Sequence, residues 1–449
     1  MRAGKARQSG SNSFLGMDRY DNSDGARQSL RRFRLRMPKM ISLALLLLLA
    51  LPVSAEKGVS PNEVVLGEAS AFSGPSAGLG VEQWRGHSAA FQAANDAGGV
   101  NGRKIRLVLT DDGYDAEKAA PAVVELITKH NVFAIFGGVG TPTIVKALPV
   151  ILKYHQAEGL FRFANFTGAQ PQREPPYDRA VFNVRASYRQ ETKAMVDAFV
   201  AKGLKKIGVY VQDDAYGASG RDGVRRALKD HGLDIVADAT YPRGQTFDVS
   251  TASQLKILRD AGVQGVVMVG AYQACAAFVR DAREAGWNAP LHNVSFVGAD
   301  QMLRLLREEE KKSGKKLTDN LIVTQVVPSY NDRSIPLVRE YAAAIDKYNP
   351  RVPPAMGDGS YAPGSKYSFG SLEGYLNAKV FLAVLHKAGA DLTRKSFYEA
   401  AEKMGKFDVG LGVPLELSAT RHQALDKVWF TYVNNDSWAS RDDPASLIH

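Results

Sequence analysis

The chain has 449 residues and a formal net charge of +10, but ten of its Lys and Arg residues and only three acidic residues fall within the first 55. The remaining 394 residues carry a formal charge of +3, and their densest basic run, REEEKKSGKK at 307–316, is interleaved with glutamates. These features argue against nucleic acid as a partner. The single cysteine, Cys275, excludes a disulfide framework and lies on an apolar helical face, as a packing thiol does.

The first 55 residues have the pattern of an export signal. The basic stretch RRFRLRMPK (31–39) precedes the apolar run ISLALLLLLALPV (41–53), and VSA stands directly before Glu56. The sequence therefore predicts cleavage before Glu56 and a periplasmic location, with Met1, Met17 and Met37 all open as start sites. A membrane anchor is the alternative, but the apolar run is short for a bilayer and no stop-transfer pattern follows.

Strands and helices are expected to alternate through most of the chain. The first set has strands at 64–70, 104–112, 132–138 and 160–165, and helices at 81–91, 115–130 and 143–156. The second set follows a Pro-rich, charged interruption at 170–185; its helices are expected at 189–202, 218–231, 251–261 and 273–285, and its strands at 205–214, 233–241, 263–272 and 294–300. This alternation predicts two doubly wound α/β units with buried parallel strands and a cleft between them.

The last third of the sequence is less regular. It predicts a strand at 321–330, a helix at 334–348, a long helix beginning near 371, and strands at 411–417 and 428–433. Between the two helices lies a loop at 351–370, rich in proline and glycine, and a loop of that length is usually functional or mobile. No repeat with a period of 20 to 50 residues stands out, so a solenoid is not expected.

The stretch FSGPSAGLG (72–80) connects the first strand to its helix, where nucleotide-binding proteins carry a phosphate loop. It lacks the Gly-Lys-Ser/Thr ending, and Gln83 stands where a dinucleotide fingerprint would need glycine. Its backbone N–H groups and the helix dipole would nevertheless suit a small anion such as a carboxylate.

Ligands of open α/β units bind beyond the carboxyl ends of the strands. The candidates at these ends are Phe72, Ser73 to Leu79, Asp111, Asp112, Gly137 to Thr143, Asn165 to Gly168, Asp213 to Tyr216, Tyr272 and Asp300. Hydroxyls, glycine amides, aromatic rings and carboxylates together suit one small zwitterion.

Each of these residues also has a structural interpretation. Thr141 could cap the following helix with Pro142 in the first turn, and Asp213 and Asp214 are better interpreted as helix caps than as ligand contacts. Asp300 is expected to end a strand, where it could cap the next helix. Tyr216 and Tyr272 could be packing residues, although both follow strands rather than lying within them.

No catalytic site is predicted. The sequence has no His-Glu-x-x-His, no Gly-x-Ser-x-Gly and no cysteine pair with metal spacing. Ser313 and Lys316 spell Ser-x-x-Lys, but in a charged segment without the companion motifs. We expect no enzyme activity, no cofactor and no metal.

The order of these motifs resembles a known family. VVLGEASAFSGPSAGLG, GGVNGRKIRLVLTDD, GGVGTPT, LFRFANFTGA, VYVQDDAYG, MVGAYQ, FVGADQML and SLEGYLNAKVF together are similar to the leucine/isoleucine/valine-type periplasmic solute-binding proteins of ABC transporters over nearly all of 60–435. The resemblance implies a type I periplasmic-binding fold, in which the chain crosses three times between two lobes that close on an amino acid or a similar solute.

The resemblance also assigns roles to individual residues. Thr141 and Thr143 match the hydroxyl loop that binds the ligand carboxylate, and Phe166, Thr167 and Gly168 match the facing loop. Tyr216 and Tyr272 match aromatic positions of the second lobe, and Asp300 matches the acid that receives the ligand ammonium. The complete set of predicted ligand-binding residues is Phe72, Ser73, Leu79, Thr141, Thr143, Phe166, Thr167, Gly168, Tyr216, Tyr272 and Asp300. The sequence departs from the family pattern at Gly140, at Pro142, at the bulky Phe166 and at the inserted 351–370.

The sequence thus predicts the substrate-binding subunit of an ABC importer, with the permease membrane subunits as partners. The first lobe is expected to comprise 56–182 plus about 328–425, and the second 183–327 plus about 426–449. A branched-chain amino acid is the favoured solute. The alternatives are a ligand sensor for a membrane receptor, a binder of aromatic acids, and a sensor or hydrolase of small amides on the same scaffold.

Overall fold

The computed structural model describes residues 56–354 and 356–448, which form two large sheets with helices on both faces and one two-stranded sheet. The predicted leader lies outside the described residues. In spatial order, the first sheet contains β2 (Lys104–Asp111), β1 (Glu63–Ser70), β3 (Ala134–Phe136), β4 (Arg162–Phe163) and β5 (Val181–Phe182). Every neighbouring pair in this sheet is parallel.

The inner strands β1 and β3 of the first sheet are buried on both faces, as their apolar sequences predict, whereas the edge strand β2 is largely half-buried or exposed. Successive residues of β1 point to opposite faces: Val64 and Leu66 join one core cluster, whereas Val65 joins another. The first cluster packs under α2 (Ala77–Asp96) and α11 (Phe369–Ala388), which contact each other along their length.

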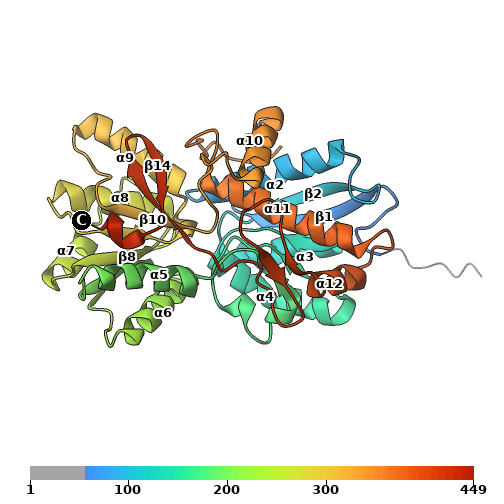
Figure 1. Ribbon diagram of the computed structural model, residues 1–449, viewed down its shortest axis with the longest axis horizontal. Coiled ribbons are helices and arrows are strands. Elements are labelled where there is room, and N and C mark those ends of the chain that lie inside the picture. The colour runs from blue at the N-terminus through green and yellow to red at the C-terminus, as the bar shows by residue number, and fades with distance from the viewer. Residues whose placement is uncertain (1–55, 355, 449) are drawn as a thin grey trace, which may run out of the picture. The chain divides into compact units, whose positions relative to one another are not determined.

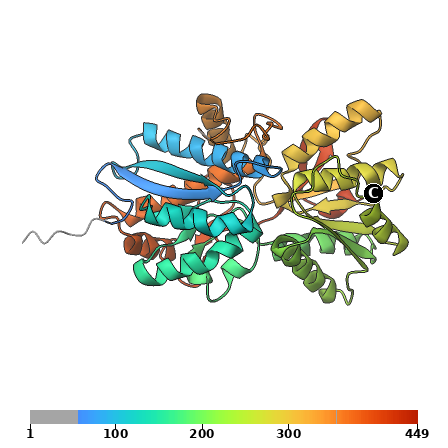
Figure 2. The same ribbon diagram turned by 180° about the vertical axis from the view of Figure 1, so that it is seen from behind.

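The first lobe consists of this sheet and its covering helices. Besides α2 and α11 they are α3 (Ala116–Thr128), α4 (Thr141–Glu158), α10 (Pro336–Tyr348) and α12 (Arg394–Glu402). Helix α3 contacts β1 and β2 on the face opposite α2, and it packs beside α4. Seen from behind, the blue strands of this sheet lie against the teal helices (Figure 2). The short pair β11 (Gly405–Phe407) and β12 (Leu415–Leu417) follows α12.

The second lobe has seven strands, of which the central ones are parallel. In spatial order they are β14 (Ser437–Arg441), β13 (Trp429–Asn434), β10 (Leu321–Gln325), β9 (Leu291–Asn293), β8 (Gly265–Val269), β6 (Ile207–Gln212) and β7 (Ala237–Tyr241). Strands β13 and β14 pair antiparallel at one edge. The helices are α5 (Tyr188–Ala201), α6 (Ala215–Asp230), α7 (Ala252–Asp260), α8 (Tyr272–Glu284) and α9 (Ala299–Ser313), and α5 packs against α6 (Figure 1).

Three segments carry the chain between the lobes. The first runs from β5 to α5, the second from β10 to α10, and the third from β12 to β13. The first and third are tied together, because Asn183 N–H donates to His422 O at 2.6 Å and Ala424 N–H donates to Asn183 O at 2.9 Å. A capping box of Ser187 and Gln190 then starts α5 directly after the first crossing.

The predicted α/β class with two lobes of parallel strands is confirmed, but some elements differ. Residues 294–300 are not a strand: β9 ends at Asn293, a 3₁₀ turn spans Ser295–Val297, and α9 begins at Ala299. Gly298, with φ 78°, turns the chain there in a conformation that other residues rarely adopt. Helix α12 and strand β14 were not predicted.

Candidate functional site

A small cavity lies between residues of the two lobes. The first lobe contributes Gly78, Leu79, Glu82, Phe166, Ser368, Phe369, Gly370 and Glu373, and the second contributes Ser295, Gly298, Ala299, Asp300, Gln301 and Gln325. Its volume is about 20 Å³, roughly enough for one water molecule. The lobes are therefore in close contact around it.

The glycines of the cavity wall permit this contact. A Cβ on Gly298 would lie 2.7 Å from Leu79 Cδ2, and a Cβ on Gly78 would lie 3.0 Å from Gln301 Cγ. Two hydrogen bonds also cross between the lobes nearby: Gln273 Nε2 donates to Pro75 O at 3.0 Å, and Gln212 Nε2 donates to the Tyr114 hydroxyl at 3.2 Å.

Asp300 lies in the first turn of α9, and its carboxylate is fixed by two donors. The Tyr330 hydroxyl donates to Oδ1 at 2.9 Å, and Phe369 N–H donates to Oδ2 at 2.9 Å. Among the described residues, no Lys, Arg or His nitrogen lies within 4.0 Å of this carboxylate. Burial raises the pKa of Asp300 to about 7, against the smaller lowering effect of the two hydrogen bonds.

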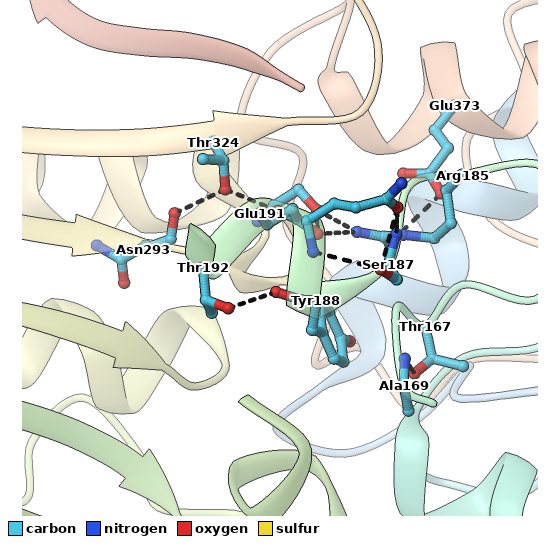
Figure 3. A network of polar contacts seen from close by, with 12 residues as sticks. Thr167, Ala169, Arg185, Ser187, Tyr188, Glu191, Thr192, Asn293, Thr324 and Glu373 are labelled. Atoms are coloured by element: carbon cyan, nitrogen blue, oxygen red, sulfur yellow. Dashed lines mark hydrogen bonds and ion pairs between the residues drawn. The ribbon is translucent and has the colours of Figure 1, made fainter. Parts of the chain in front are cut away.

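Beside the cavity, Arg185 is the centre of a buried polar network (Figure 3). Its Nη2 donates to Glu191 Oε1 at 3.0 Å and also to the Ser295 hydroxyl, and its Nη1 lies 3.4 Å from Glu373 Oε1. Glu191 Oε2 accepts further hydrogen bonds from Ser295 N–H and the Thr324 hydroxyl, both at 2.7 Å. Arg185 lies within the first crossing, Glu191 belongs to the second lobe and Glu373 to the first, so the network joins both lobes.

Burial and charge act together on this network. Burial alone lowers the pKa of Arg185, but the carboxylates of Glu373 and Glu191 hold that pKa above its ordinary value. Burial raises the pKa of Glu373 to about 7, although Arg185 acts in the opposite direction. One guanidinium thus serves two buried carboxylates.

A group of aromatic rings from both lobes packs around Phe296 of the second lobe. The ring of Phe296 lies 5.0 Å from that of Phe166, 4.7 Å from Tyr216 and 6.1 Å from Tyr114, measured between centroids. The Arg185 guanidinium stacks over Phe166 at 5.1 Å from the ring centroid. Phe166, one of the positions at which the sequence departs from the family pattern, therefore contacts both Phe296 and Arg185.

Three of the predicted ligand-binding residues line the cavity: Leu79, Phe166 and Asp300. Tyr272 lies directly beside it, because a Cβ on Gly78 would lie 3.2 Å from the Tyr272 hydroxyl and a Cβ on Gly298 would lie 3.3 Å from Tyr272 Cδ1. Tyr216 is fully buried in the aromatic group, and its hydroxyl donates to Gly270 O at 3.4 Å.

The hydroxyl loop does not line the cavity, and its hydroxyl groups already form hydrogen bonds within the first lobe. Thr141 and Thr167 share a hydrogen bond of 2.7 Å between their hydroxyls, and the Thr143 hydroxyl donates at 2.5 Å to the backbone oxygen of Val139, just before α4. Gly168 O accepts from Tyr188 N–H at 2.7 Å. Of the two interpretations of Thr141, the structure does not show the helix cap: Gly140 occupies the cap position of α4, and the Thr141 hydroxyl is hydrogen-bonded to Thr167.

The turn at residues 72–80 is also occupied by groups of the chain. Phe72 is buried, and its N–H donates to Asp111 Oδ1 at 2.9 Å, while Gly74 N–H donates to the Asp358 carboxylate at 3.0 Å. Ser73 lies partly buried beside Gly113. The Gly74 amide, which the sequence analysis expected to suit an anionic ligand, thus binds the Asp358 carboxylate from the loop between α10 and α11.

The two acidic residues that were possible helix caps, Asp214 and Asp300, differ in their roles. Asp214 does cap α6, since its carboxylate accepts from Tyr216 N–H at 2.8 Å. Asp300 neither ends a strand nor caps a helix, because the 3₁₀ turn and Gly298 place it inside α9. Its side chain is thereby free to face the first lobe, where Phe369 begins α11.

The sequence analysis did not single out three residues of the cavity wall, Ser295, Gln301 and Glu373, nor Arg185 and Glu191 of the adjoining network. Glu373 carried a usable signal, since it is an isolated carboxylate in the apolar part of a long helix. Gln301 Nε2 is buried without a hydrogen-bond partner among the described residues, so this wall also offers a donor.

Comparison with known proteins places the chain in a family. Residues 63–438 match the family model described as periplasmic binding protein. "Leu/Ile/Val-binding protein homolog 7" of Brucella abortus is 28% identical over 388 residues, which cover 84% of this chain and 92% of the relative.

Among the described residues, none of the helices combines the length and the apolar character needed to cross a membrane.

Solved structures agree with this similarity. A possible leucine/isoleucine/valine-binding protein from Rhodopirellula baltica aligns with a TM-score of 0.74 and 34% identity, covering 87% of this chain and 98% of that one. A substrate-binding periplasmic protein from Ralstonia solanacearum aligns with a TM-score of 0.72 and 28% identity, covering 84% and 100%. The chain therefore belongs to the periplasmic binding protein family, with the two-lobed α/β fold of its type I members.

Proposed function

We propose that this protein captures an amino acid-like solute between its lobes and delivers it to the membrane subunits of an ABC importer. The observation that carries the proposal is Asp300, a buried carboxylate on the cavity wall with no cation within 4.0 Å among the described residues. A ligand ammonium would supply the missing charge. The printed names of the relatives, which refer to leucine, isoleucine and valine, support an amino acid.

Capture would depend on lobe closure. The wall of the cavity comes from both lobes, so only a closed arrangement makes all the contacts, and a ligand that binds this arrangement better shifts the equilibrium toward it. The volume of about 20 Å³ means that the lobes separate, or Phe166 moves, to admit an amino acid. The proposed role needs no chemical turnover.

The remaining predicted contacts belong to the same proposal. A ligand carboxylate would take hydrogen bonds from Thr141 or Thr167, whose hydroxyls now bind each other, and from the free amide of Gln301. Leu79 and Tyr272 would contact the apolar part. The periplasm is the proposed location, after removal of the leader before Glu56.

A thermal-shift screen tests this function. The purified protein, freed of bound ligand by reversible unfolding and dialysis, is heated with each amino acid and with matched carboxylic acids that lack the amine. We expect at least one amino acid to raise the Tm, since a ligand at 100 times its Kd stabilises the folded state by about 2.7 kcal/mol. Stabilisation by amine-free acids alone would contradict the proposal, and conversion of the bound solute would favour a hydrolase.

A further inference from the structure

Glu373 is a second acid on the cavity wall, and its charge is poorly matched. It lies in the second turn of α11, and 4% of its side chain is exposed. Its Oε1 makes no hydrogen bond within the described chain, and its nearest cation is Arg185, with Nη1 3.4 Å away. A buried carboxylate normally has closer donors than this.

Arg185 cannot neutralise Glu373 fully because it also forms an ion pair with Glu191. The bond to Glu191 is the closer one, at 3.0 Å, and Glu191 is further held by Ser295 and Thr324. When Glu373 is ionised, one guanidinium between two carboxylates leaves these three groups with a net charge of −1. Arg173 adds a weaker field at Glu373, but its hydrogen bonds go to Gln423 and to backbone carbonyls.

Asp300 provides the other excess charge nearby. Its carboxylate accepts a hydrogen bond from Phe369 N–H at the start of α11, and Glu373 follows Phe369 by four residues. The Cα atoms of Phe369 and Glu373 are therefore about 6 Å apart along the helix axis. The third acid of the wall, Glu82, is neutralised by Arg85 at 2.8 Å and accepts from Tyr361 and Ser368. Among the described residues, Asp300 therefore has no Lys, Arg or His nitrogen within 4.0 Å, and Glu373 shares Arg185 with Glu191.

We propose that Glu373 is a second ligand-binding carboxylate, and that the cleft prefers an amino acid with two cationic groups over one with an apolar side chain. This inference rests on the proposed function, since it assigns the α-ammonium to one acid and a side-chain ammonium or guanidinium to the other. A single ammonium would leave one buried carboxylate without a partner, which favours the dibasic ligand in the closed state.

Calorimetry with L-lysine and L-norleucine tests the inference, because norleucine has an apolar side chain of similar length in place of the aminobutyl group. The ligand-free protein is titrated at pH 8 with both, and with L-leucine, L-ornithine and L-arginine. We expect at least one dibasic amino acid to bind at least tenfold more tightly than norleucine. In Glu373→Gln, its affinity should fall at least tenfold, while that of norleucine changes less than threefold.

Glu340→Gln is the matched control, since Glu340 lies exposed on α10 with Lys379 2.8 Å away, and it should leave both affinities unchanged. Norleucine or leucine binding as tightly as every dibasic amino acid would overturn this inference but leave the proposed function standing. Failure of all amino acids to bind would overturn both. The wild-type comparison needs no variant, so poor folding of Glu373→Gln would not prevent a decision.

Discussion

Arg185→Met is expected to lower the free energy of unfolding by about 3–5 kcal/mol at pH 8. Arg185 is almost fully buried and is the nearest cation to both Glu191 and Glu373. Methionine keeps much of the side-chain volume, but it leaves two carboxylates in a low-dielectric environment without their shared partner. Urea unfolding followed by circular dichroism measures the loss.

The loss should depend on pH in a defined direction. The folded-state pKa of Glu373 is raised to about 7, above its unfolded value of about 4.3, so the folded protein binds the extra proton between these values. The stability contribution of Glu373 is therefore greatest at low pH and is lost as pH rises through 7. Removing Arg185 should consequently cost less at pH 5, where Glu373 is protonated, than at pH 8.

Arg106→Met provides the control for charge removal. Arg106 forms an ion pair with Glu63 at 2.9 Å, but about half of its side chain is exposed, so its loss should cost less than about 1 kcal/mol at either pH. An Arg185 variant no less stable than this control, or one with the same loss at pH 5 and pH 8, would contradict the assignment of a charged buried network.

Asp300→Asn should weaken binding of the captured amino acid by about 2–5 kcal/mol, which is at least thirtyfold in Kd. The amide keeps the shape of the carboxylate and can still accept from Phe369 N–H while donating to the Tyr330 hydroxyl. It cannot neutralise an ammonium. The ligand-free variant should be at least as stable as the parent at pH 8, because burial raises the pKa of Asp300 to about 7 and its charge therefore costs stability above that pH.

Calorimetry with the best ligand of the thermal-shift screen measures this effect, and urea unfolding of the ligand-free variant checks the fold. Asp234→Asn is the control, since Asp234 is an exposed acid of the same lobe, 3.7 Å from Arg225. Equal affinities of the Asp300 and Asp234 variants would show that Asp300 serves the packing of α9 against α11 and not the ligand.

Much of the fold could be predicted because its signals are local. Strands such as β1 and β6 are apolar on both faces, and their helices follow at regular spacing, so the parallel two-lobed arrangement was visible in the sequence. Residues 294–300 were predicted as a strand because VSFVGAD is as apolar as a buried strand, but they form a 3₁₀ turn and the start of α9. Gly298 and the packing of Phe296 against Phe166 instead stop β9 early.

The site was harder to predict because its chemistry depends on contacts between distant segments. Asp300 was identified from its position after an apolar run, although its partners, Tyr330 and Phe369, come from separate segments. Arg185 lies in a segment that looked like a connection, and nothing in its neighbours indicates that it bridges Glu191 and Glu373. Only tertiary structure brings these three charges together.

Small-angle scattering of the protein with and without its best amino acid tests the central claim, that a solute is held between the lobes. Because the cavity wall comes from both lobes, a saturating ligand should favour the closed arrangement, and the radius of gyration should fall. The Asp300→Asn variant should show no such change at the same concentration. A radius of gyration that stays constant or rises in the wild-type protein would contradict capture by lobe closure.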